Sequence, residues 1–129
     1  MGAAERRLRQ LVDGLLRGEQ PDSEVCSEAL WNALTEVQQE QFDTAKGLAF
    51  TYAIRGNEMF VSRKDKSLTR ATVALAFHNA LALQKNGEDV DGPKKLKTFG
   101  ASYLYPIFIR LGVIRPVDTG QMQLWDLLS

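Results

Sequence analysis

The chain has 129 residues, of which 44% are hydrophobic and 25% are charged, an ordinary composition for a globular protein. This length predicts a single domain over residues 1–129, large enough to bury a core without disulfides or a structural metal. No apolar run approaches the ~18 residues that cross a membrane, and the charged N-terminus lacks the apolar core of a signal peptide. We therefore expect a cytoplasmic protein with no membrane partner.

The net charge is zero, but it is unevenly distributed along the chain. Residues 1–44 carry four arginines and nine acids, which gives −5. Residues 45–116 carry twelve lysines and arginines and five acids, which gives +7, and the last thirteen residues add two acids. The sequence thus predicts an acidic helical segment over residues 1–47 and a basic portion over 48–129. A basic portion of this kind is compatible with a polyanionic partner.

Residues 4–17 are predicted to form an amphipathic helix, because apolar side chains recur at three- and four-residue spacing: Leu8, Leu11, Val12, Leu15 and Leu16. This stripe either packs within the domain or pairs with a second copy as a homodimer, and the pattern favours neither. A second helix begins at Asp22 or Ser23, with the single cysteine, Cys26, on its buried face. Thr35 and Gln38 form a capping-box pattern, which predicts a third helix over 35–47.

Residues 49–63 are predicted to form a β-hairpin around Gly56-Asn57, a recognised two-residue turn. Pairing outward from the turn places Ile54 opposite Met59, Tyr52 opposite Val61, Phe50 opposite Arg63 and Arg55 opposite Glu58. The first three pairs share one face, and the last is a favourable cross-strand charge pair.

The remaining elements resemble a winged helix-turn-helix over about residues 66–126. A helix capped by Ser67 or Thr69 runs to about Lys85 and is apolar nearly all round, and a polar loop over 86–92 follows. Pro93 opens a short helix over 94–99, Gly100 makes the turn, and Ser102 caps a helix over 103–111 that ends at Gly112. Residues 113–116 and 121–125 then form the last hairpin, with its turn at 118–120.

The winged-helix order predicts one set of DNA contacts. The second helix would offer its first residues to base edges, and the preceding lysines would meet phosphates. The predicted contacts are Lys94, Lys95, Lys97, Ser102, Tyr103 and Tyr105, with Arg110 and Arg115 flanking the far end. This helix is poor in Arg, Asn and Gln, the side chains that read bases bidentately. The alternative is that the helix belongs to the core and the lysines only solvate the surface.

A second candidate is the basic segment over residues 62–70, at the start of the long helix. It offers hydroxyl groups and four basic side chains where helix N–H groups attract anions: Arg63, Lys64, Lys66 and Arg70. These residues would add phosphate contacts if the fold brings them to the same face, or would bind a phosphorylated ligand. The alternative is a capped helix start with a solvated basic loop.

The sequence predicts no enzyme, no metal and no cofactor. His78 is the only histidine and has no Cys or carboxylate at ligand spacing. We find no nucleophile elbow, no phosphate-binding Gly-rich loop and no calcium-loop pattern around the acids at 88–91.

The sequence therefore predicts an α+β, mainly helical fold with N-terminal helices, a central β-hairpin and a winged-helix-like C-terminal half. Its predicted function is duplex DNA binding of the winged helix-turn-helix type, as in a small transcriptional or mobile-element regulator. The acidic N-terminal helices would mask the basic surface or mediate a dimer. The alternative function is a non-enzymatic protein-interaction module that uses the same surface. DNA binding through lysines weakens steeply with salt, and a protein interface does so much less.

Overall fold

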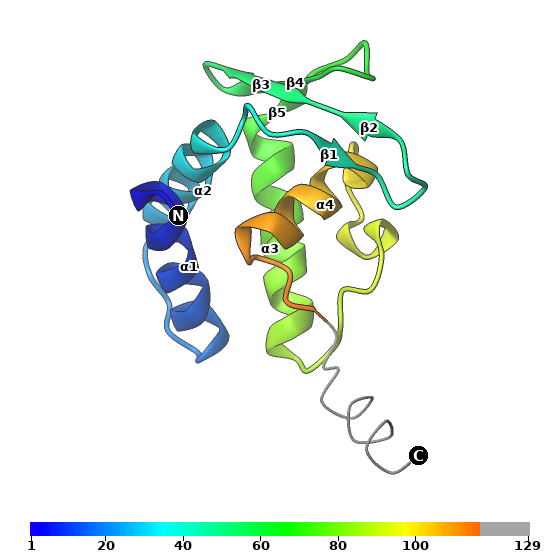
Figure 1. Cartoon of the computed structure of the whole chain (residues 1–129). Helices are drawn as coiled ribbons and strands as arrows, with labels where there is room; N and C mark the ends of the chain where they lie inside the picture. The colour runs from blue at the N-terminus through cyan, green and yellow to red at the C-terminus, as the bar shows by residue number, and fades with distance from the viewer. Residues whose placement is uncertain (117–129) are drawn as a thin grey trace, which may run out of the picture.

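The computed structural model describes residues 1–116 of the chain (Figure 1). This part has an α+β, mainly helical fold, as the sequence predicts. Its elements in chain order are α1 (Ala3–Leu16), α2 (Ser23–Glu36), β1 (Phe42–Asp43), β2 (Ala49–Phe50), β3 (Tyr52–Arg55), β4 (Glu58–Val61), β5 (Leu68–Thr69), α3 (Arg70–Lys85), the 3-10 helix η1 (Pro93–Leu96) and α4 (Ala101–Leu111).

Helix α3 is the centre of the core and contacts α1, α2, α4 and η1 (Figure 1). Helix α1 lies against α2 and also touches α3 and α4. The apolar stripe predicted on α1 faces this core, with Leu8 and Val12 fully buried and Leu11, Leu15 and Leu16 partly buried against it. Because the apolar face of α1 packs within its own chain, α1 exposes no large apolar side chain. A homodimer through residues 4–17 stays a prediction.

Two of the predicted helix starts are confirmed by their caps. The Asp22 carboxylate accepts a hydrogen bond from the backbone N–H of Glu24 at 2.7 Å and begins α2. The Thr69 hydroxyl accepts one from the N–H of Thr72 at 3.2 Å and begins α3. Each cap occupies an N–H group that the first turn of a helix leaves without a partner.

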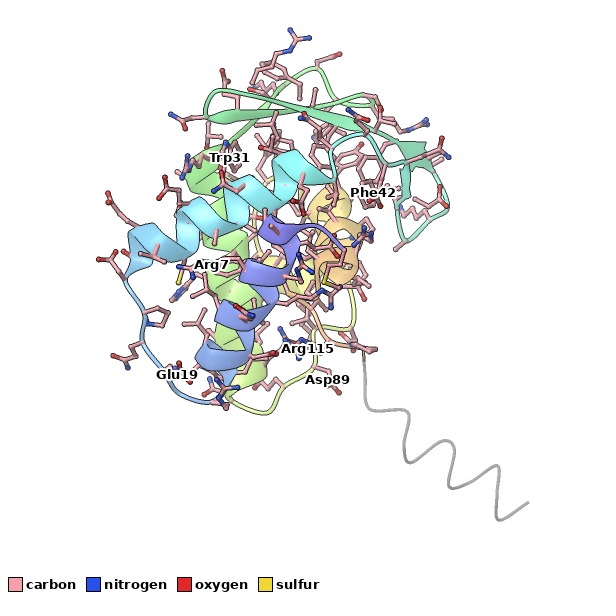
Figure 2. All side chains as sticks on the ribbon, turned by 60° about the vertical axis from the view of Figure 1, so that its left-hand side comes forward. Arg7, Glu19, Trp31, Phe42, Asp89 and Arg115 are labelled. Atoms are coloured by element: carbon pink, nitrogen blue, oxygen red, sulfur yellow. The ribbon has the colours of Figure 1, made fainter. Side chains whose placement is uncertain are left out.

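The central hairpin has the predicted register, with Ile54 opposite Met59, Tyr52 opposite Val61 and Arg55 opposite Glu58. Strand β5 adds a third strand by pairing with β4. Figure 2 shows Trp31 of α2 on the side of the hairpin that faces the helices. The Trp31 indole N–H donates to the carbonyl oxygen of Gly56 at 2.8 Å, which ties α2 to the hairpin turn.

The predicted pair of Phe50 and Arg63 is wrong, because Phe50 pairs with Phe42 in the separate ribbon of β1 and β2. The helix predicted over 35–47 is wrong for a related reason. The Thr35 hydroxyl donates to the carbonyl oxygen of Trp31 within α2, and the Gln38 side chain accepts from the N–H of Ile54 at the hairpin. Both capping residues therefore have other partners, and the chain turns back so that Phe42 packs against Phe50 and Tyr52.

The winged-helix details differ from the prediction in residues 93–116. The helix expected over 94–99 is the four-residue η1, and α4 begins at Ala101 with Gly100 as its N-cap instead of Ser102. Residues 113–116 are not a strand. The N–H groups of Val113 and Ile114 donate to the carbonyl oxygen of Phe108 and close the end of α4. The turn at 118–120 and the second strand at 121–125 lie outside the described residues.

Within residues 1–116, none of the helices combines the length and the apolar character that crossing a lipid bilayer demands. The longest of them, α3, has 16 residues.

Candidate nucleic-acid interface

Three segments that are far apart in the sequence meet around Tyr103, near the start of α4. The turn between β1 and β2 places Lys46 beside Tyr103 and Pro93, around a small pocket of about 240 Å³. The link between β4 and β5 places the Lys64 ammonium 6.0 Å from the centre of the Tyr103 ring. We call segments 44–48, 62–67 and 93–99 together the lysine edge, after the six lysines that they carry: Lys46, Lys64, Lys66, Lys94, Lys95 and Lys97.

None of the six lysines forms a salt bridge to a described residue, although Asp65 lies between Lys64 and Lys66. Five of the six lysines are exposed, and Lys64 is half-buried. Every salt bridge within the described part of the chain is made by an arginine. The five exposed ammonium groups are therefore accessible to an anion from solution, whereas the Lys64 ammonium lies over the Phe99 ring.

The predicted residues of α4 divide between this edge and another side of the helix. Ser102 is exposed in the first turn and lines the same small pocket as Lys46 and Tyr103. The Tyr103 ring packs edge-on against Phe50, with 5.0 Å between ring centres. Tyr105 lies two residues on, about 200° around the helix. Burial, and then the negative charge of Asp91, raises the pKa of Tyr105.

The sequence reasoning missed Phe99, which the structure places at the lysine edge. Its ring lies 4.2 Å from the Lys64 ammonium, a cation–π contact, yet 48% of the residue remains exposed. The signal was present in the sequence, because Phe99 directly follows the run KKLKT. The sequence analysis made Phe99 the last residue of a helix over 94–99 and assigned it no contact with a partner.

Arg63 lies at the lysine edge, whereas Arg70 does not. Arg63 is exposed, and its guanidinium donates to the carbonyl oxygen of Ala49 at 3.4 Å, so it borders the edge near β2. Arg70 lies on the α2 side of the molecule. Its guanidinium sits 5.5 Å from the Trp31 ring centre and donates to the side chain of Asn57 at 3.3 Å.

The start of α3 also differs from the anion site considered for residues 62–70. A shallow depression there is lined by three carboxylate residues, Glu24, Glu28 and Glu58, and by one cation, Arg70. The Ser67 hydroxyl, one of the groups expected to face an anion, donates to Glu58 at 2.5 Å. This concentration of negative charge opposes a phosphate at the N-terminus of α3.

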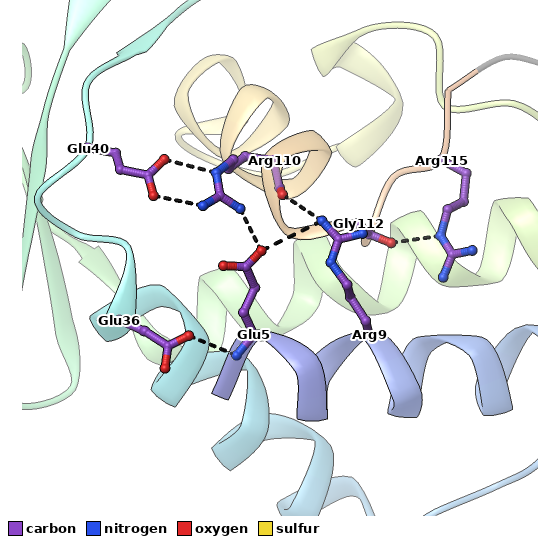
Figure 3. A network of polar contacts seen from close by, with 7 residues as sticks. All are labelled: Glu5, Arg9, Glu36, Glu40, Arg110, Gly112 and Arg115. Atoms are coloured by element: carbon purple, nitrogen blue, oxygen red, sulfur yellow. Dashed lines mark hydrogen bonds and ion pairs between the residues drawn. The ribbon is translucent and has the colours of Figure 1, made fainter. Parts of the chain in front are cut away.

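Arg110, which the sequence placed beside the DNA, belongs instead to an ion network inside the fold (Figure 3). Its guanidinium donates twice to the Glu40 carboxylate, at 2.8 and 2.9 Å, and once to Glu5 at 2.6 Å. Glu5 is only 3% exposed. The hydrogen bond from Arg110 holds the pKa of Glu5 below its ordinary value, and the two carboxylates raise the pKa of Arg110. We call Glu5, Glu40 and Arg110 the arginine network.

Neighbouring contacts secure this network at both ends (Figure 3). Glu36 accepts hydrogen bonds from the N–H groups of Ala4 and Glu5 and so caps α1 from α2. Arg9 donates to the carbonyl oxygen of Arg110 at 3.1 Å. Arg115 pairs with Asp13 at 2.6 Å, so neither Arg110 nor Arg115 is free for a partner.

A second pocket, of about 340 Å³, lies between α1, α2 and α3 and is mostly apolar. Cys26 and His78 both line it. Burial raises the pKa of the Cys26 thiol, which disfavours the thiolate that a nucleophile or a metal ligand needs. Among the described residues, no group of three or more His, Cys, Asp or Glu side chains is placed to hold a metal ion.

Comparison with known proteins assigns no family to the chain. No protein-family model, no curated protein and no solved structure matches it. What the lysine edge binds must therefore follow from its own geometry and charge.

Proposed function

We propose that this protein binds DNA through the lysine edge. The observation that carries the proposal is the convergence of three lysine-bearing segments around Tyr103, with none of the six ammonium groups in a salt bridge to a described carboxylate. Phosphates spaced along a DNA backbone suit a row of such charges, and binding releases the counterions condensed on the DNA.

The polarity of the whole fold supports this choice. Five of the nine acids of segment 1–44 lie on α1 and α2, whereas the six lysines lie on the β1–β2 and β4–β5 links and on or just after η1. A DNA strand that approaches the lysine edge therefore meets a positive face, which raises the rate of encounter. The same separation of charge argues against masking of the lysines by the acidic helices.

The contact that we propose recognises the DNA sequence less than the recognition helix of a helix-turn-helix does. Ser102 and Tyr103 lie beside the lysines, so the start of α4 can approach the DNA, but no Arg, Asn or Gln accompanies them at this end of the helix. Binding through phosphates positions a protein without specifying a sequence. A role as a small regulator, a cytoplasmic location and a dimer remain predictions.

The test is a fluorescence polarisation titration of a labelled random duplex at about 50 and 200 mM salt. Three or four phosphate contacts should reduce affinity roughly 40- to 150-fold over this range. The variant K94A/K95A/K97A should bind about tenfold or more weakly at low salt, with a smaller salt slope.

A matched control is R6A/R7A/K85A, which removes the same charge from exposed positions on α1 and at the end of α3. If both triple variants lose affinity equally, the effect is one of net charge and the lysine edge is not the site. If the unmodified protein binds neither a duplex nor a single strand at low salt, DNA binding is excluded and the protein-interaction alternative takes its place.

A further inference from the structure

Phe99 is a large aromatic residue that is only partly buried. It lies between η1 and α4, at the joint where Gly100 turns the chain, and 48% of the residue faces solvent. Large aromatic side chains are usually buried, since each can remove a large apolar area from water. An aromatic ring left open amid free lysines suggests a use outside the core.

A row of aromatic side chains leads from the core to Tyr103, and Lys64 lies between Tyr103 and Phe99. Tyr52, Phe42, Phe50 and Tyr103 follow one another with ring centres 5.0 to 5.8 Å apart. The Lys64 ammonium then bridges Tyr103 and Phe99, at 6.0 and 4.2 Å from their ring centres. Phe99 is thus connected to this row through Lys64, and about half of the residue faces solvent.

We propose that Phe99 is a stacking platform for an unpaired DNA base, so that the lysine edge prefers single-stranded DNA to a perfect duplex. This inference rests on the proposed DNA binding and names the form of DNA that the same site takes. Aromatic side chains within a basic groove are how proteins hold single strands, because every base has a π-face that stacks. In a duplex the bases are already stacked on one another and cannot use the ring.

Charge complementarity favours a nucleic acid over an apolar protein surface here. Lys64 lies over the ring itself, and Lys97 precedes it by two residues. A purely apolar partner would have to desolvate these ammonium groups without pairing them, which is costly. A nucleotide suits both features, because its base can stack on the ring and its phosphate can pair with the ammonium groups.

The experiment measures polarisation of labelled (dT)15 and of a 15-base-pair duplex at one salt concentration, with variants at Phe99. We expect F99A to weaken (dT)15 binding about 5- to 100-fold and to change duplex binding less than about twofold. F99W should retain (dT)15 affinity, whereas F99L, which keeps an apolar side chain but no π-face, should lose it as F99A does.

Phe60 provides the matched control. It is a second exposed phenylalanine, 42% exposed on β4, and it also lies against a cation, with the Arg55 guanidinium 5.7 Å from its ring centre. F60A should leave (dT)15 binding within about twofold, since a ring outside the lysine edge stacks no bound base. Circular dichroism of each variant checks that the fold is intact.

The outcomes separate this inference from the function on which it rests. If duplex DNA binds in a salt-dependent way but F99A leaves (dT)15 affinity unchanged, or matches F60A, stacking is overturned and the proposed function stands. Retention of affinity by F99L would also overturn it, because an apolar contact alone would then suffice. If neither DNA binds the unmodified protein, both proposals fail together.

Discussion

The arginine network and the lysine edge are two regions of the same basic portion of the sequence, and they use their positive charge in opposite ways. Each of the three guanidinium nitrogens of Arg110 donates to a carboxylate, Nη1 to Glu5 and Nε and Nη2 to Glu40. The lysines around Tyr103 form no salt bridge to any described residue. The guanidinium is a rigid fork that fits two carboxylates at once, whereas an ammonium on a flexible stem stays hydrated and available.

The difference shows why a charge count along the chain misjudges a binding surface. Residues 45–116 carry a net +7, but two of their arginines, Arg110 and Arg115, are paired with acids of the N-terminal segment. The acidic and basic halves of the sequence are therefore partly neutralised against each other inside the fold. What remains for a partner is mostly lysine.

The largest effect should come from breaking the arginine network. Arg110→Met leaves Glu5 buried without its cation, and removing one partner of a buried ion pair costs more than the pair itself stabilises. Allowing for the partial exposure of Arg110 and Glu40, we expect the free energy of unfolding to fall by about 3 kcal/mol. Urea denaturation followed by circular dichroism measures this change.

Arg115→Met is the control for that variant. Its partner, Asp13, is about half exposed, and pairs of this kind stabilise a protein by roughly 0–1 kcal/mol. Equal losses for the two variants would show that burial of Glu5 has no special cost, and the contrast between the two regions would lose its energetic basis.

Gly100→Ala should have the next largest effect on the free energy of unfolding, because Gly100 lies where two segments of the lysine edge pack together. Gly100 has a φ of +77°, and an added Cβ would overlap the Leu68 side chain of β5. The positive φ and the overlap should together lower the free energy of unfolding by about 2 kcal/mol. Because Leu68 ends the segment that carries Lys64 and Lys66, DNA affinity should fall as well.

Gly47→Ala separates the two causes. Gly47 also has a positive φ, of +84°, but a Cβ there would meet no atom within 4 Å. Its cost should be strain alone, about 1 kcal/mol. If thermal or urea unfolding shows Gly100→Ala to be no worse than Gly47→Ala, contact with Leu68 does not constrain this joint.

The elements that the sequence predicted correctly are those decided by neighbours in the chain. Asp22 caps α2 and Thr69 caps α3, and each accepts a hydrogen bond from a backbone N–H no more than three residues away. Gly56-Asn57 fixes the hairpin register from inside the turn. The errors fall where distant residues decide. Thr35 and Gln38 match a capping box, but the fold uses Gln38 to bind the hairpin at Ile54.

The candidate site divides in the same way. Lysine-rich segments are visible in the sequence, but their meeting around Tyr103 depends on contacts between residues far apart. Nothing local marks Arg110 as a partner of Glu5, which lies 105 residues earlier. Arg110 was therefore placed at the DNA, whereas Phe99 was overlooked although its lysine neighbours adjoin it in the sequence.

Acid should weaken the arginine network and leave the lysine edge unchanged. The folded protein holds the pKa of Glu5 below its ordinary value of 4.5. A depressed folded-state pKa gives stability that is present above 4.5 and is lost as the pH falls through the folded value. The free energy of unfolding, measured in urea from pH 7 to pH 3, should therefore fall below about pH 4.5. Arg110→Met should show a smaller fall, and an unchanged slope would mean that Arg110 is not what lowers the pKa.

The smallest change in stability should come from K94A/K95A/K97A, and it completes the contrast. These side chains are exposed and form no salt bridge to a described residue, so the free energy of unfolding should stay within about 0.5 kcal/mol. The same variant should lose DNA affinity, whereas Arg110→Met, measured under conditions where it is folded, should keep it. Each substitution would then change one property and spare the other. If removing the lysines instead destabilises the fold as much as Arg110→Met does, the ammonium groups support the structure, and their freedom could no longer be used to argue for a partner.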